Sequence, residues 1–244
     1  MSLIEHCILP DWPVPANVRT LQTTRHGGVS AAPYDSLNLG SHVGDAPLAV
    51  ARNRMLLNTL LPSEPVWLEQ VHGTAVANAD MAGCRIQADA CIARHRGSVC
   101  VVMTADCLPV LLCDERGTVV GAAHAGWKGL AAGVIEATVQ EMAVESHKLM
   151  AWLGPAIGPD AFEVGDEVRT AFVAADPQAA AAFVAGQPGK WFADIHALAR
   201  LRLAALGITR VHGGGRCTYR EREDFFSYRR DGATGRMGSF IWLE

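Results

Sequence analysis

Three short apolar segments follow one another in the middle of the chain and limit the folds open to it. They are Val99–Thr104, Val110–Cys113 and Val119–His124, and each is bounded by glycine, proline or polar residues. The connections between them are too short to contain a crossover helix, so we expect the three strands to pair largely antiparallel. A mixed sheet therefore suits this region better than a regularly alternating, parallel nucleotide-binding fold.

The rest of the chain mixes strand-like and helix-like segments. Six further segments resemble strands: Val18–Thr24, Val66–Val71, Ala88–Ala93, Leu149–Leu153, Ile208–Val211 and Phe240–Leu243. Helical periodicity marks Leu48–Leu61, Gly129–Ala143, Gly165–Ala175 and Ile195–Leu206. We therefore predict an α+β fold with mixed, largely antiparallel sheets and helices packed on their faces.

Nothing in the sequence divides the chain clearly. It has 244 residues, half of them hydrophobic, and it lacks internal repeats, charge blocks and Ser/Gly linkers. We expect one catalytic domain over residues 1–244. The alanine-rich stretch Ala174–Lys190 is the one place where a boundary or a surface excursion is expected.

Charge and cysteine content restrict the setting and the partners. The 21 basic and 25 acidic residues give a net charge of −4, which provides no general attraction to nucleic acid or to an anionic membrane. No apolar run approaches the ~18 residues of a membrane span, and the first ten residues lack the character of a signal peptide. Seven cysteines without a CxxC pair argue against a disulfide framework and a zinc finger. We predict a cytoplasmic protein.

Three residues at strand ends could bind a metal ion. His72 lies in Gln70–Gly73, Cys107 lies in Thr104–Pro109, and His124 ends the third central strand. Two imidazoles and a thiolate form a three-ligand zinc set with one open position, as in catalytic sites. The spacing alone does not establish such a site, because ordinary hydrogen-bonded histidines and buried cysteines are more common than ligands.

The same atoms also allow a cysteine hydrolase. Cys107 would be the nucleophile, His124 or His72 the base, and Asp106 or Asp89 the acid that orients the base. The sequence does not choose between this arrangement and a metal site.

Several basic residues could bind an anionic substrate. Arg25 and His26 lie in the glycine-containing turn Thr24–Ser30, and Lys128 lies where Gly126–Gly129 enters a helix. Arg229 follows two phenylalanines and a tyrosine that could stack on a base. Ordinary turns, an ordinary helix start and a buried aromatic strand edge are the competing explanations. The remaining histidines, at 6, 42, 95, 147, 196 and 212, have no companions that suggest a role.

Together these motifs resemble the bacterial laccase-domain proteins of YfiH type, formerly described as multicopper polyphenol oxidases and now as purine nucleoside phosphorylases. The matching motifs run in family order: TRHGGVS, QVHG, ADA, TADCLPVLL, AAHAGWKGL, GPAIGPDAFEVGDEV, CTY and FFSYRRDGATGR. They cover nearly the whole chain from residue 24 onward. Many relatives have arginine after the tryptophan at Trp127, where this chain has Lys128, and lysine lacks the two-pronged geometry for binding an anion.

The resemblance implies a zinc site formed by His72, Cys107 and His124. It implies phosphorolysis of adenosine, inosine, guanosine and methylthioadenosine, with deamination of adenosine as an accompanying activity. The partners are then a small purine nucleoside and phosphate. On this interpretation phosphate lies near Arg25 and His26, and Asp106 transfers a proton or supports the site.

Other functions remain open at this point. Copper, Cu²⁺, could occupy the same ligands adventitiously and give weak polyphenol oxidase activity, although copper oxidases use more histidines. Some family members are described as editing factors for cell-wall precursors, which implies a cysteine- or metal-dependent amidase. A binding module without catalysis is a third class, and it predicts that replacing Cys107 leaves function intact.

Overall fold

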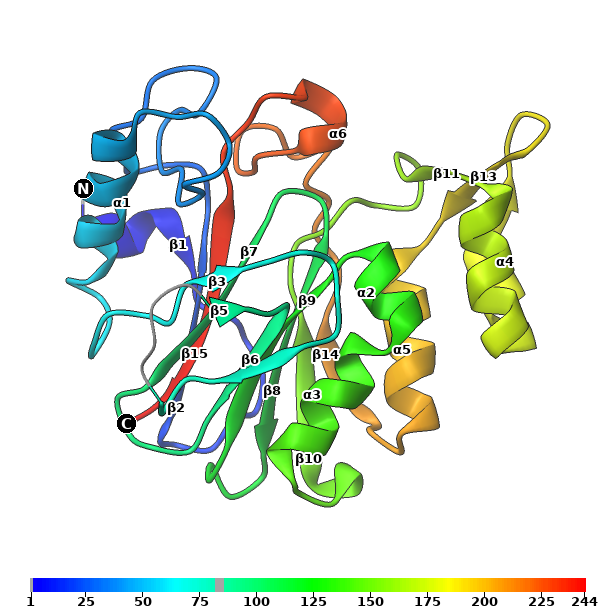
Figure 1. The fold of residues 1–244 in the computed structure, drawn as a ribbon, viewed down its shortest axis with the longest axis horizontal. Helices are drawn as coiled ribbons and strands as arrows, with labels where there is room; N and C mark the ends of the chain where they lie inside the picture. The colour runs from blue at the N-terminus through cyan, green and yellow to red at the C-terminus, as the bar shows by residue number, and fades with distance from the viewer. Residues whose placement is uncertain (1, 82–85) are drawn as a thin grey trace.

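Two β-sheets packed face to face, with helices on both outer faces, form the body of the molecule (Figure 1). The structure is a computed structural model that describes residues 2–81 and 86–244. Strand pairs are mostly antiparallel, and two pairs of the larger sheet are parallel. The predicted α+β class, with mixed sheets and helices on the faces, is confirmed.

The smaller of the two sheets is antiparallel and has the order β1-β2-β15-β7. Its strands are β1 (Cys7–Ile8), β2 (Val18–Thr23), β15 (Met237–Leu243) and β7 (Val99–Thr104). Its outer face packs against α1 (Pro47–Leu57), through Leu57, and against the short helix η1 (Leu3–His6). Helix α1 begins with a proline, which suits the first helical turn because that position needs no backbone N–H.

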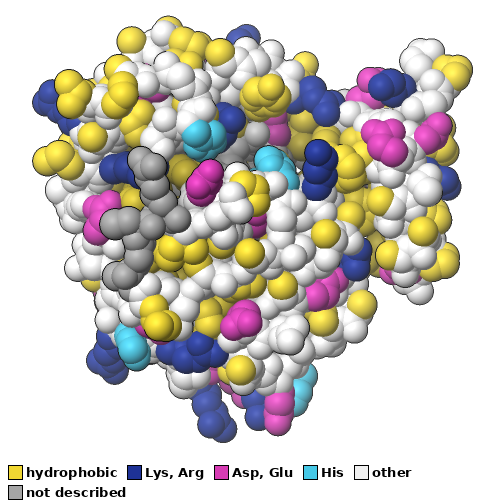
Figure 2. All heavy atoms as spheres, in the orientation of Figure 1, with side chains coloured by type: hydrophobic (Ala, Val, Ile, Leu, Met, Phe, Trp, Pro, Cys, Tyr) yellow, Lys and Arg dark blue, Asp and Glu magenta, His cyan; other side chains and the backbone are white. Residues whose placement is uncertain are grey.

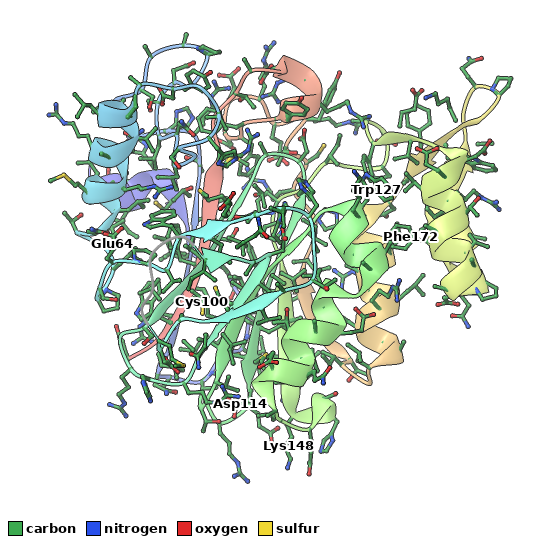
Figure 3. The ribbon with its side chains drawn as sticks, in the orientation of Figure 1. Glu64, Cys100, Asp114, Trp127, Lys148 and Phe172 are labelled. Atoms are coloured by element: carbon green, nitrogen blue, oxygen red, sulfur yellow. The ribbon has the colours of Figure 1, made fainter. Side chains whose placement is uncertain are left out.

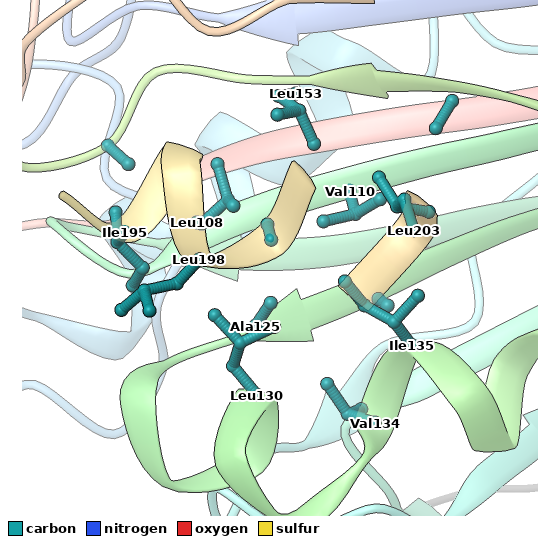
Figure 4. Packing of buried hydrophobic residues seen from close by; sticks show 14 of the residues in the cluster. Leu108, Val110, Ala125, Leu130, Val134, Ile135, Leu153, Ile195, Leu198 and Leu203 are labelled. Atoms are coloured by element: carbon teal, nitrogen blue, oxygen red, sulfur yellow. The ribbon is translucent and has the colours of Figure 1, made fainter. Parts of the chain in front are cut away.

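The larger sheet has the order β14-β10-β8-β9-β6-β4. Its strands are β14 (Arg210–Gly213), β10 (Leu149–Leu153), β8 (Leu108–Asp114), β9 (Val120–Ala125), β6 (Ala90–Ala93) and β4 (Val76–Asn78). Three helices cover its outer face: α2 (Trp127–Ala132), α3 (Val134–Met142) and α5 (Ile195–Ala205). Figure 4 shows leucine and isoleucine side chains of these helices meeting Leu108 and Val110 of the sheet.

Alternation along the central strands determines which residues point toward the site. On β9, Ala123 and Ala125 face the helices, whereas Val120 and Ala122 face the other sheet. His124 lies on the same face of β9 as Val120 and Ala122, so its ring points into the space between the two sheets. All residues of β7, β8 and β9 are buried, and a fully buried leucine in such a core contributes about 2 kcal/mol.

Two small sheets complete the fold. One consists of β11 (Glu163–Gly165), β13 (Lys190–Ala193) and β12 (Phe183–Ala185), beside α4 (Asp166–Ala175) and η3 (Pro177–Ala182). These elements project from the side of the sandwich, where the sequence predicted a surface excursion at Ala174–Lys190 (Figure 1). The other pairs β3 (Leu68–Glu69) with β5 (Ile86–Gln87). The remaining short helices are η2 (Ser146–Lys148) and α6 (Tyr228–Asp231).

The prediction for the three central strands was partly wrong. Strands β8 and β9 pair antiparallel as predicted, but β7 belongs to the other sheet and pairs with β15. The turn between β7 and β8 contains Asp106 at φ 92°, a conformation that L-residues rarely adopt. This turn carries the chain from one sheet to the other.

Three other segments differ from their predicted form. The predicted helix Gly129–Ala143 is two helices, because Gly133 adopts φ 99° and interrupts the helical backbone. Within the predicted strand Val66–Val71, only Leu68–Glu69 (β3) forms a strand, and Val66 makes a single β-bridge to Cys100. The predicted helix Leu48–Leu61 ends at Leu57. Cys84 lies outside the described residues.

Among the helices of residues 2–81 and 86–244, none has the length and apolar content needed to cross a bilayer.

Candidate metal centre

The three candidate ligands meet at one end of the sandwich. Cys107 lies in the turn that enters β8, and Pro109 pairs with His124 on β9. Trp127, at the start of α2, marks this end of the molecule in Figure 3, and Asp114 and Lys148 mark the opposite end. In the space-filling view, histidine, basic and acidic side chains lie close together over the upper middle of the face (Figure 2).

His72 is positioned by a loop bound to the free edge of β7. The side-chain amide of Gln70 donates to the Met103 carbonyl at 2.8 Å and accepts from the Met103 N–H at 2.7 Å. These two bonds satisfy backbone groups that the edge strand leaves unpaired. Two residues further on, His72 adopts φ 62°, which turns its side chain toward the strand ends.

One buried carboxylate supports two of the three ligands. Asp89, just before β6, accepts backbone N–H groups from Val71, His72 and Gly73 at 3.1, 2.9 and 2.6 Å. Its Oδ1 also lies 2.8 Å from Nδ1 of His124. Burial raises the pKa of Asp89, but these hydrogen bonds and the charge of His124 outweigh burial and lower the pKa overall. A carboxylate in this position holds the ring so that Nε2 remains available.

The ligand atoms are close enough to share one ion. Sγ of Cys107 lies 3.8 Å from Nε2 of His72, and the three donor atoms lie within 4.8 Å of one another. Zinc bond lengths to sulfur and nitrogen imply donor separations of about 3.5 Å in a tetrahedral site. Small movements of the side chains therefore suffice to bind zinc.

The electrostatics of the site favour a thiolate. Burial raises the pKa of Cys107, but the charges and hydrogen bonds of His124 and His72 lower it overall to about 6. Burial lowers the pKa of His124, but Cys107 and Asp89 raise it overall to about 9. In the absence of a metal, Cys107 and His124 thus form a thiolate–imidazolium pair between these pH values.

Two glycines let the loops approach one another closely. A Cβ atom on Gly126 would lie 2.8 Å from Cδ2 of His72 and 3.0 Å from Sγ of Cys107. A Cβ atom on Gly129 would lie 2.9 Å from the carbonyl oxygen of Gly73. The start of α2 therefore packs directly on the His72 loop because it lacks side chains there.

Asp106 is buried beside Cys107, and both its carboxylate oxygens are engaged. Oδ1 accepts from the Thr218 hydroxyl and Oδ2 accepts from the Arg229 backbone N–H, both at 2.6 Å. The carboxylate thus ties the C-terminal segment that carries α6 to the turn that carries Cys107.

Arg25 and His26 lie at the mouth of a separate polar cleft. This cleft has a volume of about 210 Å³ and is lined by Arg25, His26, Asp35, Ser36, Arg222 and Glu223. The Arg25 guanidinium donates to the carbonyl oxygens of Asp35 and Arg222 at 3.0 Å and lies 3.4 Å from the Asp35 carboxylate. Most of its hydrogen-bonding capacity is therefore occupied by the protein.

The other two predicted substrate-binding residues are exposed. Lys128 lies in the first turn of α2, with its ammonium 5.7 Å from the centre of the Trp127 ring. The Arg229 guanidinium donates to the carbonyl oxygen of Glu163 at 2.9 Å, which links α6 to β11.

Two residues near the centre were missed from the sequence. Arg236 drew attention only as part of a motif. Asp89 was considered only as an acid orienting a base, although the ADA motif contains it.

The chain is similar to several known proteins over nearly its whole length. Residues 19–244 match the family model described as multi-copper polyphenol oxidoreductase laccase. A purine nucleoside phosphorylase of Pseudomonas aeruginosa is 57% identical over 238 residues, covering 97% of this chain and 98% of that protein. Purine nucleoside phosphorylase YfiH of Escherichia coli is 57% identical over 242 residues, with 97% and 98% covered. A crystal structure of a Neisseria meningitidis protein matches with TM-score 0.94 at 54% identity, covering 98% of this chain and 99% of that one.

Proposed function

Because the chain belongs to the multi-copper polyphenol oxidoreductase laccase family, and relatives at 57% identity are named purine nucleoside phosphorylases, we propose that it is a zinc-dependent purine nucleoside phosphorylase. The proposal covers residues 1–244 as one catalytic domain. Its substrates are adenosine, inosine, guanosine and methylthioadenosine, with deamination of adenosine as a second activity.

The observation that carries the proposal is the cluster of His72, Cys107 and His124. Three donors around one point leave a fourth position open, which suits a catalytic site rather than a structural one. When bound, zinc would supply a Lewis acid at this position. Cys107 has to remain reduced to serve as a ligand, which fits the proposed cytoplasmic location.

Phosphorolysis requires little covalent chemistry from the protein. A phosphate oxygen bonds to C1′ of the ribose, the bond from C1′ to the base breaks, and the base leaves with a proton. Positioning and charge stabilisation supply most of the catalysis in such a reaction. In this site Asp89 orients His124, and Asp106 holds the segment of Arg229 against the Cys107 turn. Lys128 and Arg229 are proposed to contact the substrate at this site, whereas Arg25 and His26, the residues expected from the sequence to hold phosphate, line a separate cleft.

The test follows inosine and adenosine by chromatography with zinc-loaded protein, with and without phosphate. We expect hypoxanthine and ribose 1-phosphate from inosine only when phosphate is present, and loss of this activity in Cys107→Ala. Cys7→Ala is the matched control, because Cys7 is a half-buried thiol in β1 whose pKa burial raises to about 11. Full activity of Cys107→Ala would contradict the proposal.

The same assay separates the other activities. Conversion of adenosine to inosine without phosphate would identify the deaminase. Untouched nucleosides with one bound zinc would contradict phosphorolysis and redirect the search to cell-wall precursors. Polyphenol oxidation confined to copper-loaded protein would indicate adventitious copper chemistry.

A further inference from the structure

Arg236 is a half-buried arginine beside the metal centre without a carboxylate partner. It immediately precedes β15, whose first residue, Met237, pairs with Thr104 at the end of β7. Continuing this register by one residue places Arg236 opposite Ala105, two residues before Cys107. Within the described residues, Arg236 takes part in no ion pair.

The guanidinium of Arg236 is held by one of its two terminal nitrogens. Nη1 donates to the carbonyl oxygens of Thr234 and Gly235, each at 3.0 Å. In the part of the chain that the structure describes, Nη2 and Nε have no hydrogen-bond partner. An arginine fixed in this way presents its remaining N–H groups as a preorganised pair of donors.

The loop that follows β2 also holds Arg236 in place. The Arg236 N–H donates to Oδ1 of Asn38 at 2.9 Å, and its carbonyl accepts from the Leu39 N–H at 3.1 Å. A Cβ atom on Gly40 would lie 2.8 Å from Cγ of Arg236, so only glycine allows this approach. The backbone on both sides of the arginine is therefore fixed.

Burial lowers the pKa of Arg236, and the charges that act on it most are those of Cys107 and Asp106, neither of which forms an ion pair with it within the described residues. Arg54 likewise takes part in no ion pair among the described residues, and it donates to the Leu39 carbonyl oxygen. The hydroxyl of Thr234 is buried and unpartnered in the described part of the chain. Partly buried cations without carboxylate partners are costly unless an anion joins them.

We propose that Arg236 binds the phosphate co-substrate next to the metal centre. This inference rests on the proposed phosphorolysis and differs from the expectation for Arg25, whose guanidinium is already bound to Asp35 and Arg222. A phosphate held here lies on the Cys107 side of the candidate metal centre. Two N–H donors match two oxygens of a tetrahedral dianion.

The test compares Arg236→Gln with wild-type protein in two assays. Isothermal titration with inorganic phosphate, without nucleoside, measures binding, and inosine phosphorolysis measures the KM for phosphate. We expect phosphate binding to weaken and its KM to rise about 10- to 100-fold, as expected for losing charged hydrogen bonds, with zinc content unchanged. Arg236→Lys keeps the positive charge and the aliphatic stem. Its KM for phosphate should lie between the values of wild-type protein and Arg236→Gln.

Arg200→Gln is the matched control. Arg200 is also half-buried and donates to backbone carbonyl oxygens, at Val211 and Gly213, but it lies on α5 away from the site. Its replacement should leave phosphate binding unchanged. A wild-type KM for phosphate in folded Arg236→Gln or Arg236→Lys would overturn the proposal. It would also be overturned if the KM for phosphate rose in Arg25→Gln but not in the Arg236 variants.

The two assays distinguish this inference from the proposed function. If inosine is not cleaved but phosphate binding depends on Arg236, the anion site stands and phosphorolysis is wrong. If inosine is cleaved with a phosphate KM that is independent of Arg236, phosphorolysis stands and the assignment of Arg236 is wrong.

Discussion

The Nδ1 atom of His124 lies 2.8 Å from Oδ1 of Asp89, and both side chains are buried. The same carboxylate accepts the backbone N–H of His72, which comes from a different loop. Asp89 thus couples the ring of one candidate ligand to the backbone of another. Changes at Asp89 should therefore reach the metal site through two ligands at once.

Replacing Asp89 with asparagine should weaken zinc binding. The asparagine NH₂ group cannot accept from a backbone N–H or from His124, so part of this network is lost. We expect zinc affinity to fall about 10- to 100-fold. The free energy of unfolding should decrease by about 2–3 kcal/mol, since hydrogen bonds to a charged group are lost. Competition with a chromophoric chelator and denaturant unfolding measure the two effects.

Asp114→Asn is the matched control for this experiment. Asp114 is a buried carboxylate that also accepts several backbone N–H groups, including those of Thr118 and Val119, at the opposite end of the sandwich (Figure 3). Its replacement should reduce stability by a similar amount and leave zinc affinity unchanged. Equal zinc affinity in Asp89→Asn and wild-type protein would contradict the proposed role of Asp89.

Zinc affinity should rise with pH between the pKa values of Cys107 and His124. The Cys107 pKa is lowered to about 6, so the thiol is already a thiolate in this range. The His124 pKa is raised to about 9, so the ring is protonated and has to lose its proton before it can coordinate. Affinity should therefore increase about tenfold per pH unit in this range, with release of one proton from His124.

Titration calorimetry in buffers of different ionisation enthalpy measures that proton. A pH-independent affinity between these values would show that the thiolate–imidazolium pair is absent. In metal-free protein, iodoacetamide should modify Cys107 with an apparent pKa of about 6. Cys113, whose pKa burial raises to about 12, serves as the unreactive comparison.

The sequence identified the three candidate ligands, which the structure brings together, but not the residues that position them. Apolar runs revealed most of the buried strands, and His72, Cys107 and His124 were identified as candidates at strand ends. The sheet of β7 was misassigned because strand pairing depends on contacts far apart in the sequence, here between β7 and β15 near the C-terminus. A short connection predicted a hairpin, but a turn through the left-handed region at Asp106 changes sheets instead.

Supporting residues were missed for the same reason. Asp89 lies 35 residues from His124 in the chain, and its bonds to the His72 loop are to backbone atoms, which leave no side-chain signature. Arg236 lies beside the Cys107 turn only when β15 pairs with β7. The sequence nevertheless indicated a role for Asp89. An aspartate between alanines at the start of an apolar strand, as in the ADA motif, is buried and therefore requires a hydrogen-bonding partner.

Gly126→Ala should damage the site without unfolding the protein. The new methyl group would lie 2.8 Å from Cδ2 of His72 and 3.0 Å from Sγ of Cys107, so both ligands would have to move. We expect zinc affinity to fall at least about tenfold, since displaced ligands lose their geometry. Gly215→Ala is the control, because a Cβ atom there meets no other atom within 4 Å. Equal zinc affinity in the two variants would contradict this packing argument.

Asp106→Asn should distinguish proton transfer from positioning. Both oxygens of Asp106 are occupied, by the Thr218 hydroxyl and the Arg229 N–H, and the residue adopts φ 92°, which asparagine tolerates better than most residues. Asparagine keeps one acceptor and loses the other, so the segment of Arg229 should loosen. If Asp106 only positions that segment, kcat should fall less than about tenfold and the pH profile of the reaction should keep its shape. Loss of a general acid or base, in contrast, typically reduces the rate about 10²- to 10⁴-fold. Steady-state phosphorolysis measured from pH 5 to 9 separates these outcomes. A large fall in kcat together with loss of one limb of the pH profile would assign proton transfer to Asp106, and its bonds to Thr218 and Arg229 would then set the orientation of the transferred proton.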